Sequence, residues 1–536
     1  MQLQAALLRM EEDAHEPARL NLHPDLAQLI RSDLALVEKS FLQDEHIRET
    51  FLEILNQRGN VARTLRRMHE VGLLGKYIPE FGKLTCLVQH EFYHQYAADE
   101  HTLVCLEQLD RIWEASAPPY NAYAELFQSV ERPFVLYLAL ILHDSGKAAH
   151  AGKHSEIGAQ LALRVSRRLG LDGATSHALR LLIEHHLAMA QTSQRRDLDD
   201  PAVIRSFAAQ IQTAENLRML TLLTFADTQA TSDKLWNGFK DSLLWQIHDK
   251  TMKVLMGGSD FIRAEEKQRE LLAQEVAGML PRSFSPEEVE AHFDSLPPRY
   301  FQITAEREIV ADLTLAHRFM HHQLAEEEKA LEPVIIWHNE PDRGYTSAKV
   351  CTWDRAGLFS KIAGSFSASG MNILSAHIFT RNDGIVLDTF FVTDARTGGL
   401  INREEREKFE AVLLKALIEV EMDFPALIAR QKFARPLYQS LEGERIPTRI
   451  HFDNDTSETR TVIDIETEDR LGVLYNISQV MTDLELDISI AKIFTEKGAV
   501  MDSFYIGEAD GQKIFAPERQ KAIEEKLRAA LATLGG

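Results

Sequence analysis

Histidines and carboxylates gather in one stretch of the chain. Nine of the 21 histidines lie between His90 and His186, and the same stretch contains the pair His143-Asp144. Asp227 follows further along the chain. A mixed set of imidazole and carboxylate ligands suits a divalent cation such as Mn²⁺, Mg²⁺, Fe²⁺ or Zn²⁺. Because such an ion activates water and neutralises phosphate oxygens, these residues predict the hydrolysis of a phosphoester.

Predicted helices must position these side chains. His143 lies one helical turn beyond an apolar stripe over 136–140, and Asp227 extends a similar stripe over 220–224. His154 opens a further helix, and His185 continues an apolar face of its own. A single histidine on an apolar face is more often a core residue bonded to the backbone. Several separate helices that each end in such a group favour one shared metal site, because an unpaired buried charge is costly.

Cysteine spacing excludes other kinds of metal site. The chain has three cysteines, which are Cys86, Cys105 and Cys351, and no two form a CxxC pair. Neither a disulfide framework nor a zinc knuckle is expected. The predicted ligand set contains no cysteine, which argues against a structural zinc site.

Charge and hydropathy limit the partners. The net charge of −22 disfavours nucleic acid, because an acidic surface repels phosphate backbones. The longest apolar run, Phe134–Leu142, is too short to span a bilayer. The first residues mix acidic and basic side chains, unlike a signal peptide. We therefore predict a cytoplasmic protein that binds neither nucleic acid nor a membrane.

The chain changes character near residue 331. A length of 536 residues predicts about three to five domains. Residues 20–330 show helical periodicity, whereas strand-like runs and turns follow. Asn382-Asp383-Gly384 separates two such runs and predicts a hairpin turn.

A unit of the second half is repeated. Asp354–Thr380 and Asp469–Thr495 are identical at nine of 27 positions, beginning with a DRxG turn in each copy. The unit reads as a strand, a helix, two strands and a helix. Such a duplication predicts two related α+β modules.

Several motifs resemble known families. Leu142-His143-Asp144-Ser145-Gly146-Lys147 resembles the signature of the HD superfamily of metal phosphohydrolases, and the order of His101 upstream and Asp227 downstream fits it. Further segments of the sequence are similar to those of the bifunctional PII-protein uridylyltransferase/uridylyl-removing enzymes, which carry an HD domain and two ACT domains. These segments are Gly72–Phe81, Tyr93–Tyr96, Asp99–Leu103, His185–Leu187, Ala226-Asp227 and Leu235–Asn237.

This resemblance covers roughly residues 20–536 and implies a multidomain fold. An all-α HD-type helical domain is followed by two α+β ferredoxin-like (βαββαβ) ACT domains. The expected boundaries are a helical lead-in over 1–80, an HD domain with a helical extension over 81–330, the first ACT domain over 331–424, a linker over 425–447 and the second ACT domain over 448–536. We find no counterpart of the family's nucleotidyltransferase domain before residue 20, so we expect a fragment or a shortened relative whose hydrolase half is intact.

The resemblance also implies roles for single residues. The principal metal ligands would be His101, His143, Asp144 and Asp227, and the catalytic group would comprise His143, Asp144 and Lys147, with lysine offering positive charge to phosphate. His154, His185 and His186 would hold a second metal or orient phosphate. Arg195, Arg196 and Asp197 then follow in a polar stretch that we expect to be a surface loop.

The ACT modules imply glutamine as an allosteric effector. The residues expected to bind it are Asp354, Gly357 and Asn372 in the first module and Asp469, Gly472 and Asp487 in the second. The simpler interpretation is that each DRxG sequence is only a tight turn. The two modules would pack within one chain or across a homo-oligomer.

The resemblance implies glutamine-regulated hydrolysis of the UMP–tyrosine phosphodiester on the PII signalling protein. One alternative is an HD-type hydrolase of another nucleotide, such as a guanosine pyrophosphate. The helical stretch between Asp227 and the first ACT strand leaves no room for the extra domains of such enzymes. A non-catalytic amino-acid-sensing regulator is the other alternative, and the presence of every expected ligand type argues against it.

Overall fold

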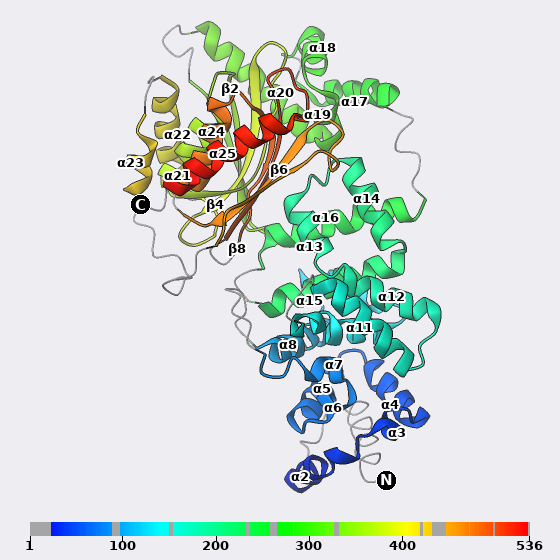
Figure 1. Cartoon of the computed structure of the whole chain (residues 1–536). Coiled ribbons are helices and arrows are strands. Elements are labelled where there is room, and N and C mark those ends of the chain that lie inside the picture. The colour runs from blue at the N-terminus through cyan, green and yellow to red at the C-terminus, as the bar shows by residue number, and fades with distance from the viewer. Residues whose placement is uncertain are drawn as a thin grey trace. The chain divides into compact units, whose positions relative to one another are not determined.

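A computed structural model gives the architecture (Figure 1). It describes residues 23–533 except for 88–96, 150–153, 232–235, 258–264, 282, 326–331, 419–421, 431–445, 471 and 497–498. The motif Tyr93–Tyr96, residue 235 of the motif Leu235–Asn237 and most of the predicted linker lie outside the described residues. The chain forms two compact units. Unit 1 comprises Met1–Thr192, Ser206–Trp236 and Leu244–Gly257; unit 2 comprises Ser193–Arg205, Asn237–Leu243 and Gly258–Gly536.

The chain up to residue 257 is helical, as predicted. Its α-helices are α2 (Pro24–Ser32), α3 (Lys39–Leu42), α4 (Glu45–Leu55), α5 (Val61–Glu70), α6 (Leu73–Tyr77), α7 (Pro79–Gly82), α8 (Ala98–Ile112), α9 (Tyr120–Gln128), α10 (Pro133–Leu142), α11 (His154–Arg168), α12 (Gly173–Glu184), α13 (Ala188–Arg195), α14 (Pro201–Ile211), α15 (Ala214–Thr231) and α16 (Gly238–Leu255). Short 3₁₀ turns, η1 (Leu34–Leu36) and η2 (Ser145–Ala148), join some of them.

Helix α10 forms the centre of unit 1. Nearly all of its side chains are buried, and it packs against α8, α12 and α15. A helix that is apolar on every side belongs in a core. The longest apolar run of the sequence is therefore this core helix. Among the described helices, no helix has both the length and the apolar character needed to cross a membrane.

Unit 2 contains one antiparallel sheet. Its strands are β1 (Val334–Glu340), β2 (Tyr345–Trp353), β3 (Met371–His377), β4 (Ile385–Asp394), β5 (Arg449–Asp453), β6 (Thr461–Glu468), β7 (Asp487–Lys492), β8 (Thr495–Glu496) and β9 (Ala499–Gly507). The order is β1-β2-β4-β3-β7-β9-β6-β5, with β8 beside β9. The two modules join at β3 and β7, where Ala376 pairs with Ala491.

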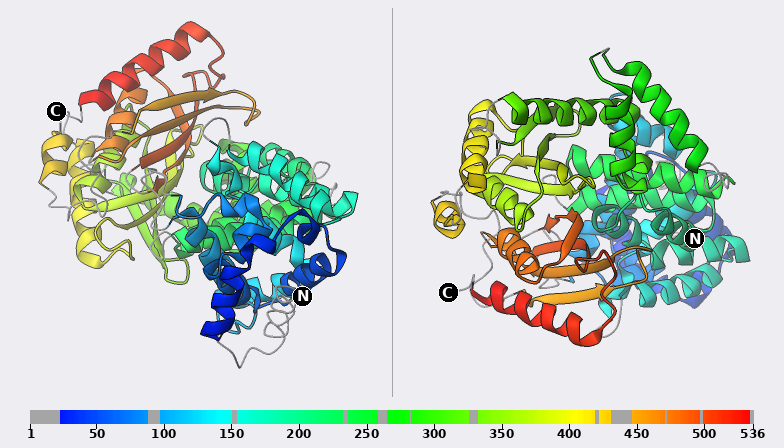
Figure 2. Two further views of the ribbon diagram at one scale, coloured as in Figure 1. Left: turned by 60° about the horizontal axis from the view of Figure 1, so that its bottom comes forward. Right: turned by 90° about the horizontal axis from the view of Figure 1, so that it is seen from above.

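Helices cover one face of this sheet (Figure 2). They are α21 (Leu358–Ala368) and α22 (Arg403–Ile418) from the first module, and α24 (Val473–Asp483) and α25 (Pro517–Thr533) from the second. Their apolar side chains and those of both modules' strands form a single core. The predicted hairpin turn is confirmed, because Gly384 donates from its backbone nitrogen to the Arg381 carbonyl oxygen and the Ile385 strand follows.

The strand order within each module differs from the expected βαββαβ. The described residues of the first module run β1-β2-α21-β3-β4-α22, and the second module repeats this order. An added first strand, β1 or β5, pairs with the next strand through a hairpin and covers the edge of β2 or β6. In a βαββαβ module a final strand covers that edge. The fold class is thus as predicted, but the edge strand comes first in each module.

The helical extension predicted within 81–330 belongs to unit 2 from residue 258. It forms α17 (Glu265–Met279), α18 (Pro286–Ser295), α19 (Pro298–Ile303) and α20 (Glu306–Ala325). Val276, Phe293 and Phe319 pack with Cys351 and Leu387 of the sheet. Helical periodicity alone could not distinguish a second helical layer of the HD domain from helices that cover a sheet.

Part of the predicted linker is also structured. Helix α23 (Phe424–Ala429) buries Phe424 and Ile428 against Ala368 and Ala416. The ring of Phe424 lies directly against Gly364, where a Cβ would approach it to 2.7 Å. The beginning of the segment 425–447 therefore belongs to the packing of the first module.

The stretch Arg195–Asp197 is not the expected free surface loop. Arg196 makes two 2.8 Å hydrogen bonds to the carboxylate of Asp464 on β6. The backbone nitrogen of Asp197 donates to the hydroxyl of Tyr505 on β9 at 2.7 Å. The four residues of these contacts all lie within unit 2. Their charges are satisfied by tertiary contacts that sequence periodicity does not report.

Candidate metal centre

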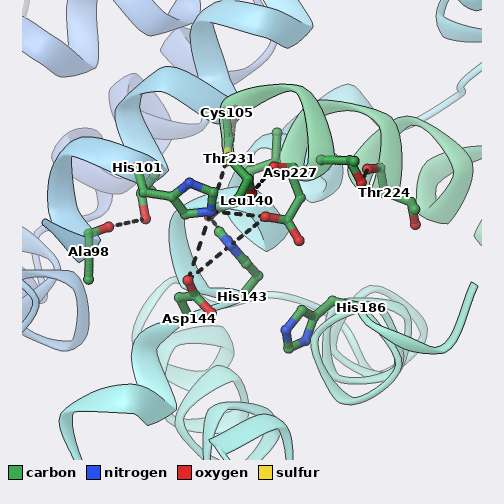
Figure 3. A network of polar contacts seen from close by, with 12 residues as sticks. Ala98, His101, Cys105, Leu140, His143, Asp144, His186, Thr224, Asp227 and Thr231 are labelled. Carbon is green, nitrogen blue, oxygen red and sulfur yellow. Dashed lines mark hydrogen bonds and ion pairs between the residues drawn. The ribbon is translucent and has the colours of Figure 1, made fainter. Parts of the chain in front are cut away.

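Side chains from two helices and one helix end converge in unit 1 (Figure 3). His101 lies on α8, His143 ends α10, and Asp227 lies on α15. Nε2 of His101 is 2.9 Å from Oδ1 of Asp227, and Nε2 of His143 is 3.7 Å from the same oxygen. One ligand atom from each of these residues and the sulfur of Cys105 all lie within 4.8 Å of one another.

A second group adjoins the first. One ligand atom each from Asp144, His154 and His186 also lie within 4.8 Å of one another. The rings of His143 and His186 have centroids 5.5 Å apart, as do those of His154 and His186. Oδ2 of Asp144 lies 3.4 Å from Nε2 of His143 and 4.0 Å from Nε2 of His101, so this carboxylate faces both groups.

His143 and His186 are oriented by the backbone in the same way. Nδ1 of His143 donates to the Leu140 carbonyl oxygen, and Nδ1 of His186 donates to that of Ile183, each at 2.7 Å. In the neutral rings the lone pair is therefore on Nε2. Both Nε2 atoms are buried, and among the described residues neither has a hydrogen-bond partner, although Oδ2 of Asp144 lies 3.4 Å from Nε2 of His143. Buried nitrogens left in this state are costly unless a ligand uses them, and this arrangement is that of metal-binding histidines.

The carboxylates of this site favour a positive charge between them. Burial lowers the pKa of His143, but Asp144 and Asp227 outweigh it and raise that pKa to about 9, so a cation bound at Nε2 would have to displace a proton. Burial and the neighbouring His143 lower the pKa of His186 to about 4, so this ring stays neutral as a ligand must. For Asp144 burial raises the pKa, but His143 and Lys147 bring it well below its ordinary range.

Lys147 contacts the centre through Asp144. Its Nζ lies 2.8 Å from Oδ2 of Asp144, one turn earlier in the chain. The side chain of Lys147 is 10% exposed and that of Asp144 is 4% exposed. Lys147 thus joins His143 in holding the carboxyl group of Asp144 in its charged form.

Gly146 lies where a side chain could not fit unless the backbone moved. A Cβ at this position would lie 1.9 Å from the carbonyl oxygen of His154 and 2.9 Å from the backbone nitrogen of Gly158. The start of α11 therefore packs directly on the η2 backbone. This close approach brings His154 to Asp144.

His185 does not join either group. It is half-buried at the end of α12, and burial lowers its pKa. Of the pair His185-His186, only the second residue faces the centre, because consecutive residues at a helix end point in different directions.

Sequence reasoning missed Cys105. This cysteine is fully buried, and its Sγ lies 3.6 Å from Nε2 of His101. The signal was present, because residues four apart on a helix share a face. Burial, together with Asp227 and Asp144, raises the pKa of this thiol well above its usual value.

The two DRxG turns have the same backbone form. Gly357 and Gly472 precede α21 and α24 with φ of 73° and 84°, a conformation that favours glycine. Neither position has a side-chain cap, so the first backbone N–H groups of both helices lack that partner. A Cβ at Gly357 would touch Thr482 of α24 at 3.2 Å, which places the first turn against the other module.

The remaining residues expected to bind glutamine lie near these turns in sequence but differ in surroundings. Asp354 and Asn372 are exposed, and Asn372 is the second residue of β3. Asp487 is the first residue of β7 and forms a 2.8 Å ion pair with Arg460. Asp469 is exposed.

Family comparisons agree with this architecture. A family model described as the HD domain matches residues 99–224, which include His101, His143, His154 and His186. The model "Uridylyltransferase GlnD third domain" matches residues 4–77. The model "ACR9-like, ACT-like domain" matches residues 449–534.

Whole-chain relatives agree as well. The bifunctional uridylyltransferase/uridylyl-removing enzyme of Ruegeria pomeroyi is 32% identical over 527 residues, covering 98% of this chain and 56% of the relative. The enzyme of the same name from Azospirillum brasilense is 32% identical over 517 residues, covering 96% of this chain and 54% of the relative. The chain spans about half the length of these curated relatives. It is thus a relative, along almost its entire length, of the bifunctional uridylyltransferase/uridylyl-removing enzymes, with an HD domain and an ACT-like region.

Proposed function

We propose that this chain is a metal-dependent phosphodiesterase that removes UMP from uridylylated tyrosine on the PII signalling protein, under the control of glutamine. The observation that carries the hydrolase is the pair of buried, unpartnered Nε2 atoms of His143 and His186 beside the carboxylates of Asp144 and Asp227. Two buried nitrogens without hydrogen-bond partners are costly to a fold, whereas a divalent cation would bind both of them.

The residues fit such an ion. His101, His143, Asp144 and Asp227 would hold the principal metal, and Asp144, His154 and His186 would hold a second. A bound divalent ion supplies Lewis-acid charge that activates water and stabilises phosphate oxygens. Lys147 keeps Asp144 ionised, and the Leu140 and Ile183 carbonyl oxygens keep His143 and His186 in the required tautomer.

The substrate is proposed from the relatives. The name of those enzymes includes a uridylyl-removing activity, and the described HD residues are of the type that such hydrolysis needs. The UMP–tyrosine bond is a phosphodiester, which suits a site that combines cationic and imidazole groups. We do not extend the proposal to the transferase activity in that name, because the proposed centre is built for hydrolysis.

Glutamine is proposed to bind at the DRxG turns. The uncapped N–H groups that follow Gly357 and Gly472 suit a carboxylate. A Cβ at Gly357 would lie 3.2 Å from Thr482 of the other module, so a ligand held at this turn would lie close to both modules. Such a ligand can regulate hydrolysis only if it binds one arrangement of the protein more tightly than another.

Release of UMP from uridylylated PII is the test. The full chain is assayed with Mn²⁺, with and without glutamine, beside a His143→Ala/Asp144→Ala variant and an exposed control, His177→Ala. We expect release that glutamine stimulates, that the double variant loses and that the control retains. No release with Mn²⁺, Zn²⁺ or Fe²⁺ would reject the substrate. Release without any response to glutamine would reject only the effector.

A further inference from the structure

Cys105 lies inside the proposed centre. It is one turn after His101 on α8, and its sulfur points to the same nitrogen that faces Asp227 (Figure 3). The thiol is fully buried. It belongs to one group with His101, His143 and Asp227 in which all ligand atoms lie within 4.8 Å of one another.

A hydrogen bond between the Cys105 thiol and His101 explains their contact poorly. Nε2 of His101 is 2.9 Å from a carboxylate oxygen of Asp227 and 3.6 Å from Sγ of Cys105. If Nε2 donates its proton to the carboxylate, it cannot accept one from the thiol. The unpartnered Nε2 of His143 faces the same group and is an independent sign of a missing cation.

The spacing suits ligands of one metal ion. Metal–thiolate and metal–imidazole bonds are about 2.3 Å and about 2.1 Å long, so two such ligands at a tetrahedral angle are roughly 3.6 Å apart. The separation of Cys105 Sγ and His101 Nε2 is 3.6 Å.

We propose that Cys105 is a thiolate ligand of the principal metal, together with His101, His143 and Asp227. This rests on the metal centre proposed above. Formation of the metal–sulfur bond releases the thiol proton to solvent. Because thiolate is a soft ligand, the site prefers Zn²⁺, Co²⁺ or Fe²⁺ over Mg²⁺.

Cobalt binding to the full chain under reducing, anaerobic conditions is the test. A cobalt–thiolate bond gives an intense near-ultraviolet charge-transfer band that nitrogen and oxygen ligands do not give. The Cys86→Ser/Cys351→Ala double variant leaves Cys105 as the single thiol of the sequence, since the chain has three cysteines. The Cys105→Val variant removes that thiol and keeps a similar volume, and Cys105→Ser offers oxygen instead.

We expect the band in the wild type and the double variant and its loss in Cys105→Val, with at least about tenfold weaker preference for Zn²⁺ over Mg²⁺. X-ray absorption of the zinc-loaded wild type should show sulfur at about 2.3 Å, even if Cys105→Val fails to fold. Cobalt bound without the band, or a band that survives in folded Cys105→Val, would overturn the role of Cys105 while the metal centre stands. Failure of the wild type to bind cobalt or zinc at all would overturn both.

Discussion

Nε2 of His101 lies 2.9 Å from Oδ1 of Asp227, although 126 positions separate the two residues. The contact joins α8 to α15, which pack along each other in the core of unit 1. Asp227 remains 19% exposed at its side chain, whereas His101 is only 3% exposed. The contact therefore joins a buried imidazole to a carboxylate that solvent partly reaches.

Metal binding should stabilise unit 1 through this pair. An ion at 100 times its dissociation constant adds about 2.7 kcal/mol to stability, which raises Tm by roughly 5–11 °C for a domain of this size. We expect Zn²⁺ or Mn²⁺ to raise the Tm of the wild type and to leave that of Asp227→Ala unchanged. His177→Ala, which alters an exposed histidine of the same unit, should respond as the wild type does. Equal Tm shifts in the wild type and both variants would mean that the ion binds away from Asp227.

Much of this site was predictable because several of its residues lie at positions that helical periodicity fixes. His143 and Asp227 lie at the ends of apolar stripes, and the structure brings both into one group of possible ligands. His185 and Cys105 show the limit. His185 was expected near the metal because it adjoins His186, but it lies outside both groups. Cys105 was not expected there because CxxC spacing does not reveal a cysteine that lies one helical turn from a histidine.

The fold shows the same limit. Alternation and turn residues predicted the strands of both modules, but not that β1 and β5 would cover the edges. Edge pairing depends on contacts between strands, which local periodicity does not encode. Helices α17–α20 were expected as an extension of the HD domain but pack on the sheet, because an amphipathic helix does not reveal which apolar surface it covers.

Gly146→Ala should separate the two groups of the centre. The new methyl group would lie 1.9 Å from the His154 carbonyl oxygen, so the start of α11 must move. Overpacking of this kind costs about 1–3 kcal/mol. We expect a lower Tm and a loss of one bound metal equivalent where the wild type binds two, as measured by thermal unfolding and elemental analysis.

Gly173→Ala is the matched control, because a Cβ there meets nothing within 4 Å. It should keep both the Tm and the metal content. A Gly146→Ala chain that matches this control in both respects would show that the close approach to His154 is not needed.

Asp110 should make unit 1 less stable as pH rises. Burial raises its pKa from 3.8 to about 7, against hydrogen bonds from Tyr137 and Ala62 that lower it. The folded state therefore binds this proton more tightly than the unfolded state. Its contribution to stability is fully present below about pH 4, falls as pH rises to about 7, and is constant above that.

Asp110→Asn removes this titration and keeps an acceptor for the Ala62 nitrogen. Relative to the wild type, we expect the variant to gain stability as pH rises from about 4 to just above 7, by up to about 4 kcal/mol. Hydrogen exchange of α10 amides measures the difference. Asp172→Asn, which alters an exposed helix cap whose pKa is lowered, should show no such gain over the same range. A constant difference between Asp110→Asn and the wild type would contradict the assignment.

The ion pair of Arg196 and Asp464 should stabilise unit 2 far more than an exposed pair does. Its two hydrogen bonds are each 2.8 Å long, and the Asp464 side chain is 11% exposed. Burial raises the pKa of Asp464, but Arg196 brings it below its ordinary value. Removing the arginine leaves a buried carboxylate, which costs about 3–5 kcal/mol. Arg195, 3.5 Å from the same carboxylate, should keep the loss near the lower end.

We therefore expect Arg196→Met to destabilise unit 2 by about 3 kcal/mol, measured by hydrogen exchange of β6 and β9 amides. The double variant Arg196→Met/Asp464→Leu should recover most of this loss, because no charge is then left unpaired. Arg205→Met tests an exposed pair with Glu458 from the same segment and should cost at most about 1 kcal/mol. Equal effects of Arg196→Met and Arg205→Met would mean that the segment lies free of the sheet in solution, and the expectation of a surface loop would then be restored.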